Sequence, residues 1–142
     1  MKHLFCLLFL FTLPVFAGNT PPSDTANSDY LKGQARLKRE NMQTLVKKSE
    51  ELLALYGGYK DKARSCAGAK PQWQKAMKLS KKANKKSKKG LKLADKAEKA
   101  KKMKKAKKFL SGIDALQLSA REDCQVAEER QKEIEFEIRG CN

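Results

Sequence analysis

The stretch that decides the fold of this chain is PQWQKAMKLSKKANKKSKKGLKLADKAEKAKKMKKAKKFL, residues 71–110. Lysine and alanine, both strong helix formers, make up most of it, and Pro71 suits the first position of a helix. Alanine, serine and glycine are interleaved with the lysines. The stretch therefore predicts one long lysine-rich helix, although lysine pairs four residues apart oppose it slightly. Gly90 is the expected place for a kink or a second hairpin.

Two further helices are predicted, one on each side of this stretch. From residue 30 to residue 56 apolar residues recur every three or four positions, and Gly57-Gly58 ends the pattern. A short additional turn of helix is expected within 59–67. Ser111-Gly112 indicates another break, and a third helix with its own apolar stripe is expected over 113–139.

Short turns between these helices predict an all-α fold. We expect an elongated antiparallel three-helix bundle or coiled coil, with a long Lys-rich middle helix, as a single helical domain over 30–142. A zigzag of helices over about 30–56, 71–110 and 113–139 places the stretch 31–56 level with 117–142, so the two apolar stripes meet. A middle helix of this length is roughly 60 Å long, which predicts a rod.

The first seventeen residues have the layout of a secretory signal. A basic start precedes an apolar run from Leu4 to Val15, and the small residues Val15 and Ala17 follow the pattern of a cleavage site. We expect cleavage after Ala17 and a secreted or periplasmic protein. The alternatives are an uncleaved anchor and a buried N-terminal helix. Residues 18–29, which contain two prolines and almost no apolar side chain, predict a flexible N-terminal tether.

Three cysteines remain after cleavage, and an exported protein meets an oxidising compartment. In the zigzag Cys141 is level with about residue 55, close to Cys66, so a Cys66–Cys141 disulfide is preferred. Cys66–Cys124 is the alternative pairing, and the third is that all three cysteines stay reduced. With Cys66 and Cys141 paired, Cys124 becomes a small core residue.

The residue types argue against catalysis and metal binding. The only histidine, His3, lies in the signal, so His-based triads and His-ligated zinc are not expected, and no CxxC motif occurs. We therefore expect a non-enzymatic protein with no cofactor and no metal. The acidic residues near the C-terminus would suggest a cation site, but a solvated or lysine-paired face is the preferred interpretation. They are Glu128, Glu129, Glu133, Glu135 and Glu137.

The charge distribution points to an anionic partner. The chain has 32 Lys+Arg against 16 Asp+Glu and a formal net charge of +16. Residues 70–108 hold 18 Lys, no Arg, and only Asp95 and Glu98 as acids. Lysine attracts phosphate as a point charge but does not read bases in the bidentate manner of arginine, and Trp73 is the only aromatic residue between 60 and 108. Sequence-specific nucleic acid is therefore not an expected partner.

The candidate polyanion-binding residues all lie in this segment. They are Lys75, Lys78, Lys81, Lys82, Lys85, Lys86, Lys88, Lys89, Lys92, Lys101, Lys102, Lys104, Lys105, Lys107 and Lys108. The Lys/Ala composition of 75–108 resembles linker-histone tails and bacterial nucleoid-compacting tails, but the export signal disfavours a chromosomal role.

The predicted function is non-specific binding of an anionic polymer or membrane surface. In an exported protein the anions are anionic lipid heads, lipopolysaccharide, acidic wall polymer or extracellular nucleic acid. The alternative is a helical protein-protein interaction or structural module of the envelope, working as a homodimer or on a protein partner, with a merely solvated Lys face. In that alternative the apolar stripes or Cys124 mediate the contact.

Overall fold

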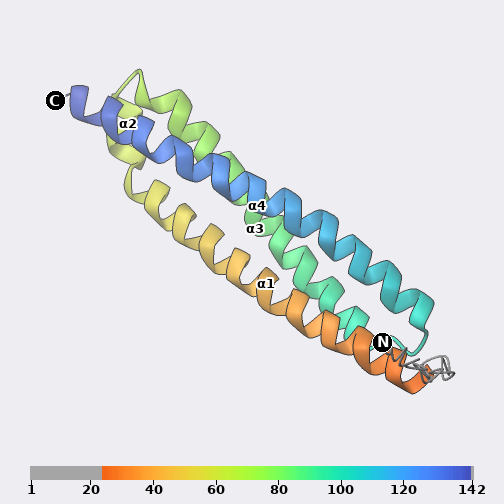
Figure 1. The fold of residues 1–142 in the computed structure, drawn as a ribbon. Coiled ribbons are helices and arrows are strands. Elements are labelled where there is room, and N and C mark those ends of the chain that lie inside the picture. The colour runs from red at the N-terminus through yellow and green to blue at the C-terminus, as the bar shows by residue number, and fades with distance from the viewer. Residues whose placement is uncertain (1–23, 142) are drawn as a thin grey trace, which may run out of the picture.

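The computed structural model describes residues 24–141, which form four helices and no strand (Figure 1). The helices are α1 (Asp24–Gly58), α2 (Lys60–Ser65), α3 (Ala69–Glu98) and α4 (Met103–Gly140). The prediction of an all-helical bundle is confirmed. The predicted signal peptide, 1–17, lies outside the described residues, and so does the first half of the predicted tether.

Three long helices lie side by side in Figure 1, where α1 and α4 run in one direction along the molecule and α3 runs in the other. α3 packs against both α1 and α4, and α1 also contacts α4. A helix of 38 residues such as α4 is about 57 Å long, so the described part of the chain is a rod.

The core has a seven-residue repeat in which α3 supplies small side chains at every position but Trp73. Its buried residues alternate at spacings of four and three, the pattern of a coiled coil. They are Ala69, Trp73, Ala76, Ser80, Ala83, Ser87, Gly90, Ala94 and Ala97. The larger buried side chains come mostly from the neighbouring helices, among them Met42 and Tyr56 of α1 and Ile113 and Ile134 of α4. Because most buried side chains of α3 are small, its backbone lies close to the neighbouring helices.

Gly90 does not break the helix, so the expectation of a hairpin there was wrong. α3 continues through it without interruption. A Cβ atom at Gly90 would lie 2.2 Å from Cε of Met42, closer than atoms can approach. Glycine lets Met42 of α1 pack directly on the backbone of α3 there, and burial of Met42 offsets the low helix propensity of glycine.

The second reversal of the chain also differs from the prediction. α3 ends at Glu98 and α4 begins at Met103, so the helices expected over 71–110 and 113–139 are divided at 99–102 instead of at 111–113. Ser111 and Gly112 lie inside α4 because Leu110 and Ile113 on either side of them are buried in the core. Tertiary burial thus outweighs the local break signal.

At its N-terminal end α1 begins at Asp24, so helix replaces the end of the predicted tether, 18–29. Leu31, near the start of α1, is buried in the core. Its burial holds the N-terminal part of α1 against the bundle and so favours helix in the residues just before it. At the other end α1 stops at Gly58 and the short α2 follows, as the glycine pair predicts.

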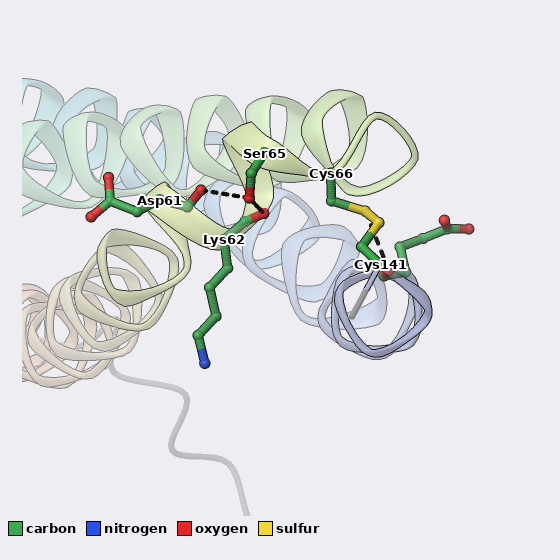
Figure 2. The surroundings of a disulfide bond; sticks show 6 residues. Asp61, Lys62, Ser65, Cys66 and Cys141 are labelled. Atoms are coloured by element: carbon green, nitrogen blue, oxygen red, sulfur yellow. Dashed lines mark hydrogen bonds between the residues drawn. A yellow bond between two sulfur atoms is a disulfide. The ribbon is translucent and has the colours of Figure 1, made fainter.

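The Cys66–Cys141 disulfide closes one end of the rod (Figure 2). The two Cα atoms are 5.9 Å apart, and 75 residues separate them along the chain. This is the pairing that the sequence favoured, and Cys124 is the free, buried cysteine. The predicted register, which placed 31–56 beside 117–142, was nevertheless wrong. Lys38 pairs with Asp114 and Tyr59 pairs with Glu135, and in both pairs the partners are 76 residues apart in the sequence. α1 therefore lies level with an earlier part of α4 than expected.

Aromatic residues pack next to the disulfide. Trp73 Nε1 donates a hydrogen bond to the carbonyl oxygen of Tyr56 at 2.7 Å, and the hydroxyl of Tyr56 donates to the carbonyl oxygen of Ala127. Burial raises the pKa of Tyr56 to about 12. Trp73 is thus held within the bundle by a buried hydrogen bond.

Candidate polyanion-binding face

One line of exposed lysines follows the outer side of α3. The residues are again spaced alternately by three and four, so they stack on one face of the helix. They form what we call the lysine stripe: Lys75, Lys78, Lys82, Lys85, Lys89, Lys92, Lys96 and Lys99. Every position on this line from 75 to 99 is lysine, over about 36 Å. The small core residues of α3 repeat with the same period, which keeps the stripe on the outer face along its whole length.

The acids nearest the stripe are already paired with α1. Asp95 binds Arg39 at 2.5 Å, and Glu98 binds Arg39 at 2.7 Å and Arg36 at 3.1 Å. The hydrogen bond from Arg36 lowers the pKa of Glu98, and the hydrogen bond to Asp95 raises the pKa of Arg39. The only two carboxylates of the segment 70–108 therefore serve the contact between α1 and α3.

None of the stripe lysines has an ion pair within residues 24–141. Two other candidate lysines do. Lys86 pairs with Asp123 and donates a 2.7 Å hydrogen bond to Oγ of Ser119 on α4, while Lys88 pairs with Glu50 of α1 at 2.9 Å. The hydrogen bond from Lys88 lowers the pKa of Glu50. Lys86 and Lys88 thus join α3 to its neighbours, and Lys81 stays exposed beside the stripe.

The remaining candidates are gathered around the turn between α3 and α4. Lys101 and Lys102 lie in the turn, and Lys104, Lys105, Lys107 and Lys108 lie on the first turns of α4. All six are exposed. The first turn of α4 holds no acid, and no side chain caps it, so the positive end of the helix dipole adds to these charges. The sequence had predicted that all six lie on the middle helix. That prediction was wrong, because α3 ends at Glu98, before the first of them.

Lys96 and Lys99 were not among the candidates singled out from the sequence. The structure places both in the lysine stripe and leaves both exposed. The signal that identifies them is their spacing, because they continue the three- and four-residue steps from Lys92.

The spaces between the lysines have apolar walls. One hollow of about 470 Å³ is lined by Trp73 and Met77 together with Lys78, Lys81 and Lys85. Such walls form because a lysine side chain lays its methylene stem along apolar surface while its ammonium group stays in water.

Two glutamates of α4, Glu128 and Glu135, bind side chains from α1 and from the residue that follows it. Glu128 pairs with Lys48 at 2.8 Å, and Glu135 accepts a 2.6 Å hydrogen bond from the hydroxyl of Tyr59, which lowers the pKa of Glu135. Within the part of the chain that the structure describes, no group of three or more His, Cys, Asp or Glu side chains could hold a metal ion.

Comparison with known proteins gives no assignment: no family model, curated protein or solved structure matches this chain. Over residues 24–141, none of the helices combines the length and hydropathy that crossing a bilayer requires.

Proposed function

We propose that this chain is an exported, non-enzymatic protein that binds polyanions without sequence specificity. In this proposal it works as an elongated antiparallel three-helix coiled coil, and its lysine-rich middle helix, α3, presents the binding face. The anions available to an exported protein are lipid headgroups, lipopolysaccharide phosphates, acidic wall polymer and extracellular nucleic acid.

The observation that carries the proposal is the lysine stripe, a line of exposed lysines, none of which has an ion pair in the described residues. A polymer laid along it would release its condensed counterions, which makes the binding strong at low salt and weak at high salt. Lysine lacks the fork geometry that reads a base edge or a sugar sulfate pattern, so the face selects charge density and not sequence.

The test compares two variants that lose the same charge. K78Q/K82Q/K85Q/K89Q removes the middle of the stripe, and K47Q/K60Q/K62Q/K132Q removes four exposed lysines elsewhere that have no ion pair in the described residues. Each phosphate contact contributes about 0.9 to the slope of log affinity against log salt on B-DNA, so the stripe variant loses up to about 3.6 from that slope.

We expect the stripe variant to elute from heparin at clearly lower salt than the control variant, with unchanged helicity in far-UV circular dichroism. The control variant should keep nearly the slope of the unmodified chain. Equal losses in both variants would mean that net charge alone drives the retention, and the stripe would then not be a site.

A second candidate function is a helical interaction module, and exposed apolar side chains favour it. Leu37 is 56% exposed, Leu118 63% and Phe136 75%. Cys124 does not serve this role, because it is fully buried and burial raises the pKa of its thiol. The module predicts an oligomer in sedimentation velocity that persists at about half-molar salt, where surface charge interactions are screened. A monomer there, at high protein concentration, contradicts self-association.

A further inference from the structure

The turn between α3 and α4 borders a hollow of about 740 Å³ that is open to solvent, which we call the turn hollow. The volume lies within the range of about 300–1,000 Å³ that is typical of small-molecule sites. Six lysines line it, three from the end of α3 and the residue after it, and three from the turn and the start of α4. They are Lys92, Lys96, Lys99, Lys101, Lys102 and Lys105.

The charge of the turn hollow is almost entirely positive. Asp95 is the only carboxylate in its lining, and it is held by Arg39 at 2.5 Å. None of the six lysines has an ion pair in the part of the chain that is described. The complement of such a site is a compact anion with more than one charge. A phosphate monoester carries about −1.5 to −2 at pH 7 and offers three acceptor oxygens, and lysine binds it as a point charge.

The remaining walls of the turn hollow are apolar. Ala100 and Phe109 line it, and both also pack against the hydrophobic core, so they are fixed in place. A fully hydrated anion gains little from such walls. A ligand that carries an apolar group next to its phosphate gains free energy there, because it removes Phe109 and the lysine stems from water.

We propose that the turn hollow binds one molecule of a phosphorylated amphiphile, a lipid phosphate in chemical terms. The phosphate lies among the six lysines, and the first part of the apolar chain lies against Phe109. This inference rests on the proposed function and deepens it. The lysine stripe attracts a phosphate-rich surface, and the turn hollow takes a single headgroup from it.

The test is isothermal titration calorimetry of the full, disulfide-bonded chain with decyl phosphate below its micelle concentration, at about 0.15 M salt. Inorganic phosphate and decyl phosphocholine are the reference ligands, since the first lacks the apolar chain and the second lacks the net charge. We expect binding of one decyl phosphate per chain, at least about tenfold tighter than either reference ligand.

Two triple variants locate the site. K99Q/K101Q/K102Q should weaken decyl phosphate binding by at least about tenfold, whereas K75Q/K78Q/K82Q, with the same loss of charge at the far end of α3, should change it less than about threefold. Equal losses in the two variants would overturn the turn hollow as the site.

The two proposals can fail separately. If decyl phosphate binds no tighter than inorganic phosphate while the stripe variant still elutes early from heparin, the lipid phosphate proposal is wrong and the polyanion proposal stands. If the stripe variant and its control elute together, the polyanion proposal is wrong. If decyl phosphate still binds tightly and its binding depends on the turn hollow, the protein binds a lipid phosphate but has no polyanion-binding face.

Discussion

Gly90 sets the distance between α3 and α1, so replacing it tests the packing on which the lysine stripe depends. A Cβ atom there would lie 2.2 Å from Cε of Met42 and 3.1 Å from both its Cγ and its Sδ. Met42 is fully buried, so its side chain can make room only by shifting within the packed core. The perturbation is the single methyl group of Gly90→Ala.

Two effects of opposite sign determine the result. Alanine favours a helix interior over glycine by about 1 kcal/mol, whereas an additional methyl group in a packed core costs about 1–3 kcal/mol. We expect Gly90→Ala to lower the free energy of unfolding by about 1 kcal/mol. Met42→Ala itself costs about 2–5 kcal/mol, but it opens the space, so Gly90→Ala should be stabilising by about 1 kcal/mol in that background.

The assay is urea unfolding followed by far-UV circular dichroism, with the disulfide intact. Gly33→Ala is the control, because Gly33 lies within α1, is exposed, and has no atom within 4 Å of its added Cβ. It should show the helix-propensity gain alone, about 1 kcal/mol. If Gly90→Ala stabilises the unmodified chain as much as Gly33→Ala does, the close approach of α3 to α1 is refuted.

The disulfide, the paired glutamates and the lysine stripe each affect stability in a way that can be measured. Replacing both Cys66 and Cys141 by serine should lower the free energy of unfolding by about 2–4 kcal/mol in urea, because the disulfide closes a long loop whose chain entropy alone is worth about 4.5 kcal/mol; a midpoint equal to that of the oxidised chain would contradict this. The folded-state pKa values of Glu50, Glu98 and Glu135 lie below the usual 4.5, so their contribution to stability is complete above pH 4.5 and is lost as the pH falls through the folded-state values. The melting temperature should decline there, and E50Q/E98Q should flatten the decline; a variant with the unmodified acid profile would show that these pairs do not matter. Finally, K82E/K89E should be more stable than the unmodified chain by about 1.5–4 kcal/mol at low salt, because four repulsions in the stripe become attractions, with about half the gain for K82Q/K89Q. Its heparin retention should fall, and a variant that gains no stability would show that the stripe stores no repulsion.

Much of the fold could be predicted from local residue types. Gly57-Gly58 correctly gave the end of α1, and the placement of Cys66 after it gave the disulfide. The turn at 99–102 could not be predicted in this way, because the same lysines and alanines occur before it, within it and after it. The chain reverses there since this register buries Leu110 and Ile113, which is a property of the assembled bundle.

The candidate site was predictable as a segment but not residue by residue. Lys85 and Lys86 are neighbours in a uniform lysine run, yet Lys85 is exposed and Lys86 is bound to Asp123. The difference depends on which side of α3 faces α4, and one residue turns a helix by about 100°. Likewise, only the register of α1 against α3 brings Arg39 to Asp95, and that contact pairs the acid that lies nearest to the lysine stripe.

The composition of the lysine stripe argues against a face that is only solvated. A solvated helix face is stabilised by mixing charges, and the chain does this elsewhere: Lys32 pairs with Asp29 on α1, and Arg130 with Glu133 on α4. The stripe contains no acid at all. Neighbouring like charges at helical spacing cost about 0.2–0.5 kcal/mol each, so its successive pairs together cost about 1.5–3.5 kcal/mol, a large part of the stability of a small domain. An anion laid along the stripe removes that cost, whereas water and salt reduce it only in part. A face that is destabilising in the free protein and relieved by a polyanion is what a binding site for a polyanion requires.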